Sequence, residues 1–128
     1  MGTSSGSLTP IVQAPCDLSN PFQDWSEICQ DQNCEVFYVQ NHGSRLCLHA
    51  NTRASHGAIT QWECNWISNV DWSIRKSPVP GTFALESRIS GSRGLCLNIP
   101  GGSGGPGLPL WLYECNDTPD FLWQAFRH

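Results

Sequence analysis

The chain has 128 residues, of which 39% are apolar and 14% charged, which suits one folded domain and is too short for two independent ones. A formal net charge of −4 leaves no broad basic surface, which argues against nucleic-acid binding and against adsorption to anionic membranes. The apolar runs span only a few residues, so no membrane-spanning helix is expected.

Cysteine is abundant, with seven residues in the chain. Their spacing includes no Cys-x-x-Cys pair, which favours disulfides over a metal site. Disulfides form in oxidising compartments, so we expect a secreted, extracellular protein. The small, polar residues 1–7 are predicted to lie outside the fold, as a disordered stretch, an added start or the start of a processed mature chain.

The first predicted unit, residues 8–34, is short. It begins with the extended stretch 10–16, which ends in Cys16, and a further strand carries Trp25 nine residues later. The pair Cys29 and Cys34 closes this unit.

The second unit, residues 35–76, contains four predicted strands. The segment 35–39 is rich in β-branched and aromatic residues, and a Leu-Cys-Leu motif follows at 46–48. The stretch 58–64 ends in a cysteine, and Trp72 stands eight residues beyond it. Period-2 alternation and the lack of any helical stripe predict β-structure.

The third unit, residues 82–128, repeats this order. A strand at 82–85 is followed by Leu-Cys-Leu at 95–97, a cysteine-ended stretch at 108–115, and Trp123. The glycine-rich run 101–107 lacks the Lys-Ser/Thr ending of a phosphate loop and is expected to be a flexible hairpin connection.

These three units form a repeat of about 50 residues. The cysteines that end the three stretches, Cys16, Cys64 and Cys115, are spaced by 48 and 51 residues. A self-similarity of this period predicts a repeat architecture.

The repeat resembles the ricin-B family, whose hallmark Gln-x-Trp is complete here only at Gln23-Asp24-Trp25. The resemblance implies an all-β fold, a β-trefoil with pseudo-threefold symmetry over residues 8–128, and about ten of its twelve strands. The first two strands of the first repeat have no counterpart. The three repeated tryptophans are expected to pack in the core: Trp25, Trp72 and Trp123.

The family's disulfide joins the second strand to the third within a unit. This implies the pairs Cys47–Cys64 and Cys96–Cys115, each contributing roughly 3 kcal/mol. Cys29 and Cys34 are expected to pair locally, which leaves Cys16 without a predicted disulfide partner. Either a missing segment or a partner chain would complete the first repeat and occupy Cys16; a pairing of Cys16 with Cys29 or Cys34 is the alternative.

The resemblance also implies sugar sites. The family uses an Asp after the second-strand Cys-Leu, an aromatic residue two before the third-strand cysteine, and an Asn-Gln before the fourth-strand Trp. The corresponding residues are His49, Trp62 and Asn69 in the second repeat, and Asn98, Tyr113 and Asp120 in the third. Neither repeat keeps the Asp, and a carboxylate accepts stronger hydrogen bonds than an amide or an imidazole. Galactose specificity is therefore not carried over.

For the other aromatic residues and the histidines, a structural role is weighed against a functional one. Trp66 is expected to be a second wall of the Trp62 site or a contact with a partner chain, and either Trp111 or Tyr113 is expected to be packed. The four histidines have no metal-ligand spacing, so we expect no metal, and no motif suggests a cofactor.

The leading functional hypothesis is a carbohydrate-binding, lectin-type module for glycoprotein or glycolipid sugars, serving as the targeting part of a toxin or secreted enzyme. The alternative is a protein-interaction subunit with a degenerate lectin trefoil, similar to the lectin-like subunits of cytolethal distending toxin. No nucleophile-elbow pattern is present, so we do not expect an enzyme.

Overall fold

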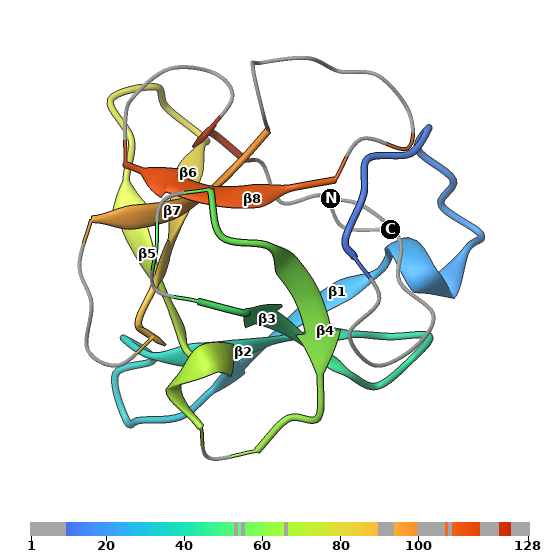
Figure 1. Cartoon of the computed structure of the whole chain (residues 1–128), viewed down its shortest axis with the longest axis horizontal. Coiled ribbons are helices and arrows are strands. Elements are labelled where there is room, and N and C mark those ends of the chain that lie inside the picture. Colours follow the sequence, from blue (N-terminus) through green and yellow to red (C-terminus); the bar gives the residue numbers. More distant parts are fainter. Residues whose placement is uncertain are drawn as a thin grey trace.

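The computed structural model describes residues 10–52, 54, 56–65, 67–89, 94–99, 107, 109–115 and 121–123. Across these ranges the regular structure is almost entirely strand, as expected for an all-β chain (Figure 1). The elements are β1 (Trp25–Cys29), β2 (Phe37–Asn41), β3 (Cys47–Ala50), β4 (Ile59–Trp62), β5 (Trp72–Lys76), β6 (Phe83–Ser87), β7 (Leu95–Asn98) and β8 (Trp111–Glu114), with the 3-10 turns η1 (Pro21–Gln23) and η2 (Ser68–Val70). Among the described residues, no helix has the length and apolarity to cross a membrane.

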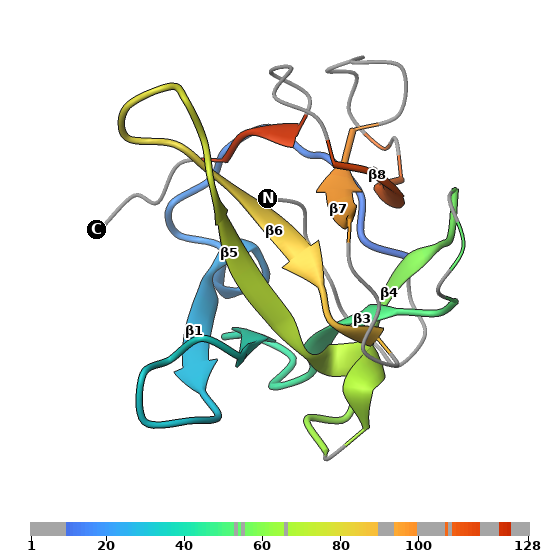
Figure 2. The same cartoon turned by 90° about the vertical axis from the view of Figure 1, so that its left-hand side faces the viewer.

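The strands form one antiparallel sheet in the order β4-β3-β2-β5-β6-β7-β8, and β1 pairs with β2. Figure 2 shows β5 and β6 side by side as a long hairpin, in which Trp72 faces Ser87 and Lys76 faces Phe83. Two further extended segments join the sheet through the bridges Val12–Pro109 and Phe83–Trp123. Together with β1–β8 they give ten extended segments among the described residues. In the first unit these are the segment at Val12 and β1, which correspond to the third and fourth strands of the repeat.

The strand β2 begins two residues later than the sequence predicts, at Phe37 rather than Glu35. The reason lies in the hairpin before it. The Asp31 carboxylate accepts a hydrogen bond from the backbone N–H of Glu35 at 2.8 Å, and the Cys29–Cys34 disulfide closes the turn. The backbone of Glu35 is thereby used in the turn, and the ladder with β1 begins where Cys29 faces Phe37.

The three units meet at equivalent positions around the core. Ile11, Ile59 and Leu110 each stand five residues before the cysteine that ends their stretch, and each is at most 2% exposed. The N–H of Ile11 donates to the carbonyl of Ile59 at 3.0 Å, and that of Leu110 donates to the carbonyl of Ile11 at 2.8 Å. The segment around Ile11 is therefore an integral part of the fold.

The repeated tryptophans lie at the core as expected, although not equally deep. Trp72 is fully buried, and its indole N–H donates to the carbonyl of Leu48 at 3.0 Å. Trp25 and Trp123 are partly buried and pack against the same core cluster. The indole nitrogen of Trp123 is buried, and no hydrogen-bond partner for it is found among the described residues.

Three disulfides link the described residues: two in the pairing that the family resemblance implies, and one in the local pairing expected for Cys29 and Cys34. They are Cys29–Cys34, Cys47–Cys64 and Cys96–Cys115. Cys16 is a free, exposed thiol. The last two disulfides tie the second-strand and third-strand positions of each repeat together, which fixes the hairpins β3–β4 and β7–β8.

Candidate functional site

The hairpin β3–β4 places two of the predicted residues of the second unit, His49 and Trp62, on one face. Cys47 lies opposite Trp62 in the ladder, and His49 lies opposite Thr60. Alternate residues of a strand share a face, so these four side chains point to the same side of the hairpin. The rings of His49 and Trp62 are 6.0 Å apart between centroids.

His49 is held in one orientation by a small polar network. Its Nδ1 lies 2.8 Å from Oδ1 of Asn51 and 3.0 Å from Oγ1 of Thr60. The Thr60 hydroxyl donates its own proton to Asn51 Oδ1 at 2.6 Å, so both oxygens act as acceptors toward the imidazole. Nδ1 therefore carries the proton in the neutral ring, and Nε2 is left as an acceptor.

Burial lowers the pKa of His49, and the hydrogen bond with Asn51 opposes that shift in part. The side chains that face the ring, Asn51, Thr60 and Trp62, carry no titratable group. The residue is only 8% exposed. At neutral pH this position accordingly presents a neutral acceptor where the family has a carboxylate.

Trp62 is half-buried because one part of its ring packs against the cluster that contains Tyr38, Val70 and the Cys47–Cys64 disulfide. Val70 occupies the position at which the family has Gln, and it is fully buried. The Asn69 amide donates to the carbonyl of Ala50 at 2.9 Å, which ties η2 to the end of β3. The structure thus places His49 and Trp62 on one face of the hairpin and ties Asn69, on η2, to the end of β3.

The hairpin β7–β8 repeats the arrangement with different chemistry. Cys96 lies opposite Tyr113, and Asn98 lies opposite Trp111. The Trp111 indole N–H donates to Oδ1 of Asn98 at 2.5 Å. Trp111 is half-buried and Tyr113 is 38% exposed, so Trp111 is the more packed of the two, and Tyr113 offers the free aromatic surface.

His56 packs beside Trp111 and Tyr113, a contact that its sequence spacing did not predict. Its ring lies 4.5 Å from that of Trp111 and 4.9 Å from that of Tyr113, measured between centroids. The ring of Phe121 lies edge-on to that of Tyr113, with 6.4 Å between the two centroids. The signal that could have found His56 is its repeat position, since it stands where the third unit has Gly107.

Some predicted features lie outside the described residues. These are Asp120, Trp66, residues 1–7 and the glycine-rich run up to residue 106.

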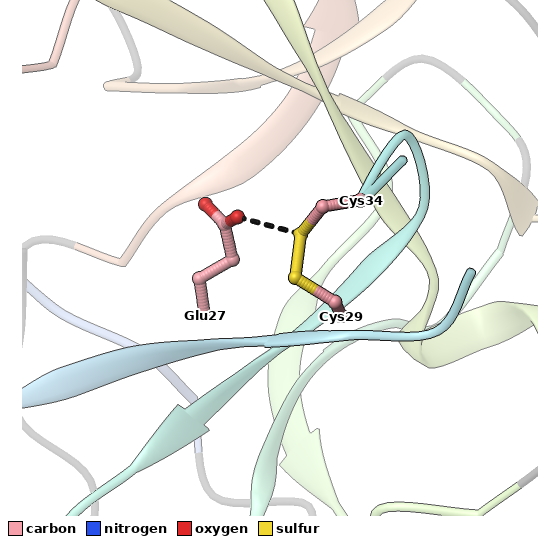
Figure 3. Close-up of side chains that lie close together, drawn as sticks. All are labelled: Glu27, Cys29 and Cys34. Carbon is pink, nitrogen blue, oxygen red and sulfur yellow. Dashed lines mark hydrogen bonds between the residues drawn. A yellow bond between two sulfur atoms is a disulfide. The ribbon is translucent and has the colours of Figure 1, made fainter. Parts of the chain in front are cut away.

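One cluster of potential metal ligands is present among the described residues, and its chemistry does not suit a metal. Glu27, Cys29 and Cys34 bring their ligand atoms within 4.8 Å of one another. Figure 3 shows the two sulfur atoms joined in a disulfide, with a carboxylate oxygen of Glu27 2.9 Å from the Cys34 sulfur. A disulfide sulfur carries no proton to donate, and the thiolates that would bind a metal are absent while the bond is closed.

Comparison with solved structures identifies the fold. The designed threefold-symmetric protein ThreeFoil matches with a TM-score of 0.83 at 15% identity, over 94% of this chain and 83% of that one. The ricin B-like lectin of Macrolepiota procera, in complex with lactose, matches with a TM-score of 0.72 at 17% identity, over 92% and 83%. A Culex quiquefasciatus salivary protein of the Cysteine and Tryptophan-Rich family matches with a TM-score of 0.61 at 16% identity, over 94% and 87%.

These likenesses establish the β-trefoil fold of the ricin-B type, which confirms the prediction made from the repeat. At such low identity they establish the fold alone. No family model matches the sequence, and no curated protein matches it.

Proposed function

We propose that the protein is a carbohydrate-binding module with two shallow sites, one on the face of β3–β4 and one on the face of β7–β8. A sugar ring would stack its apolar C–H face on Trp62 in the first site and on Tyr113 in the second. The polar contacts would come from His49 and Asn69 in the first site. In the second they would come from Asn98 and Asp120.

The observation that carries the proposal is the repeated juxtaposition of an aromatic ring and a hydrogen-bonding side chain. In both hairpins the aromatic residue faces the second-strand cysteine, and the polar residue lies two positions further on the same face. Such a surface offers stacking and directional polar contacts together, as small-ligand sites do. The structural likeness to a lectin solved with lactose supports the same class of ligand.

At the position where the family has Asp, both sites offer a neutral hydrogen-bonding group, His49 in one and Asn98 in the other. Nε2 of His49 is an acceptor, and Oδ1 of Asn98 already accepts from Trp111. Neither position supplies a carboxylate, so each site would bind weakly, and affinity for a glycosylated surface would come from engaging both sites at once.

The test is a binding screen with lactose and the methyl glycosides of galactose, glucose, mannose and N-acetylgalactosamine, followed on a glycan array with multimerised protein. Trp62→Ala and Tyr113→Ala should each weaken binding at their own site by about tenfold or more, because each removes the stacking surface. Ile74→Ala is the matched control, since it removes another exposed apolar side chain, 49% exposed, from β5. Absence of binding by the multimerised wild type on the array would contradict the proposal.

We further propose that the module acts outside the cell as a binding rather than a catalytic domain, attached to or accompanying a toxin or a secreted enzyme. Three disulfides fit an oxidising compartment. One of the structural neighbours is a salivary protein, which supports secretion.

A second candidate function is the binding of a partner polypeptide at the incomplete first repeat. Among the described residues β1 pairs with β2 only, and four of its five side chains are exposed. Cys16 offers an exposed thiol on the same unit. Reducing and non-reducing gels with intact-mass analysis separate the cases, because a monomer with a free Cys16 thiol argues against a covalent partner.

A further inference from the structure

The loop between β3 and β4 holds a histidine in a backbone conformation that favours glycine. His56 has a φ of 66°. In this left-handed region the Cβ of an L-residue crowds the neighbouring carbonyl, so glycine is the usual residue there. His56 stands three residues before the buried Ile59, and the equivalent residue of the third unit, three before Leu110, is Gly107 with a φ of 81°.

The two loops make the same backbone hydrogen bond. The N–H of His56 donates to the carbonyl of Leu112 at 2.8 Å, and the N–H of Gly107 donates to the carbonyl of Gln13 at 2.7 Å. Leu112 and Gln13 are themselves equivalent, two residues beyond Leu110 and Ile11. Each loop thus reaches the third strand of the next unit. In the loop before β8, the residue with the positive φ that makes this hydrogen bond is a glycine, Gly107. The backbone alone therefore gives no reason for an imidazole at residue 56.

The reason for the imidazole lies in what the ring contacts. It packs on Trp111 and Tyr113, which both belong to β8 of the following unit. His56 is exposed, and no hydrogen bond to its ring is present in the described part of the chain. A strained residue that persists where glycine would suffice is typical of a functional position.

We infer that His56 is a wall of the third-unit site contributed by the second unit, and that it determines which sugars bind there. A pyranose stacked on Tyr113 would place a hydroxyl against the imidazole edge, where the ring nitrogens donate or accept. The inference rests on the proposed function. It makes the third-unit site a composite of two repeats, with the imidazole as an added polar contact.

The experiment compares His56→Gly with Arg45→Gly. Arg45 also has a positive φ, 63°, and stands two residues before Cys47, where the third unit has Gly94 with a φ of 81°. Both substitutions should therefore raise the melting temperature by about 2–5 °C through relief of the same backbone conformation. Arg45 is on a different turn, before β3, and serves as the matched control for binding.

Binding is measured by calorimetry with lactose and the four methyl glycosides, in a Trp62→Ala background that silences the second-unit site. We expect His56→Gly to weaken binding by about tenfold and to change the order of preference among the glycosides, while Arg45→Gly leaves both unchanged. Retention of parental affinity and preference in His56→Gly would overturn the inference. A gain in affinity would overturn it as well, because the ring would then cover the platform instead of completing it.

The controls separate this inference from the proposed function. If the wild type binds, Tyr113→Ala abolishes the binding that remains in Trp62→Ala, and His56→Gly has no effect, only the role of His56 fails. If Trp62→Ala alone removes all binding, the third unit has no site and the inference fails while the second-unit site stands. If the wild type binds none of the probes on the array or in solution, the proposed function itself fails.

Discussion

His49 is nearly buried and carries its proton on Nδ1 when neutral, which makes its position sensitive to acid. The unfolded chain binds a proton on this side chain at its ordinary pKa of 6.5, whereas burial lowers the pKa in the folded state. Below pH 6.5 the unfolded state therefore binds more protons than the folded one. The contribution of His49 to stability is complete above pH 6.5 and is lost as the pH falls through the folded pKa.

We expect the free energy of unfolding, measured by urea titration, to fall more steeply between pH 7 and pH 5 in the wild type than in His49→Asn. Asparagine is the residue at the equivalent position 98, and it does not titrate. His42→Asn removes an exposed imidazole and is the matched control. Parallel pH profiles for the wild type and His49→Asn would show that His49 is not the acid-sensitive group.

The sequence predicts which residues line the two hairpin faces but not which hydrogen bonds they make. The aromatic and polar positions follow from spacing relative to the cysteines. The hydrogen bonds of the His49 ring are made with Asn51 and Thr60, and Oδ1 of Asn98 accepts one from Trp111. These partners are set by side-chain geometry, which spacing does not encode.

The hairpins β3–β4 and β7–β8 are the elements that carry the two proposed sites, and a disulfide ties each of them. Cys96–Cys115 spans 19 residues and its first cysteine is fully buried, whereas Cys29–Cys34 spans 5 residues at the surface. In the chain-entropy description, a longer closed loop restricts the unfolded chain more.

Replacement of Cys96 and Cys115 by alanine should therefore lower the free energy of unfolding by about 3 kcal/mol or more, and replacement of Cys29 and Cys34 by about 2 kcal/mol. Urea unfolding of the two double variants measures this difference. A larger loss from the Cys29–Cys34 variant would indicate that the β1–β2 turn, and not the β7–β8 hairpin, limits stability.

The element boundaries show where local sequence is insufficient. Strands are present at both predicted segments, 35–39 and 82–85, but β2 and β6 begin later, at Phe37 and Phe83, and extend further toward the C-terminus, to Asn41 and Ser87. Both ends are polar and fully buried. Their burial comes from neighbouring units, so local propensity does not reveal them.

The three units contact one another at the core through Ile11, Ile59 and Leu110. Ile11 is the contribution of the first unit. Ile11 and Ile59 are equivalent and almost fully buried, at 0% and 1% exposure. Deleting buried methyl groups removes the transfer free energy and leaves a cavity.

Ile11→Ala and Ile59→Ala should each lower the free energy of unfolding by about 3 kcal/mol. Leu18→Ala, at a side chain that is 66% exposed, should change it by less than about 0.5 kcal/mol. Chemical unfolding of the three variants tests this expectation. An Ile11→Ala variant as stable as the wild type would mean that the N-terminal segment does not hold the units together.

The residue pattern predicts the repeat and the all-β class, because each unit uses the same residue types at a spacing near 50. The trefoil and the pairs Cys47–Cys64 and Cys96–Cys115 follow from the resemblance of this repeat to the ricin-B family. How the three units meet is set in the folded molecule. His56 lies 57 positions before Tyr113, yet their rings are 4.9 Å apart, because the β3–β4 loop of one unit reaches the third strand of the next. A contact of this kind is set by the symmetry of the folded molecule, and no pattern within a single unit records it.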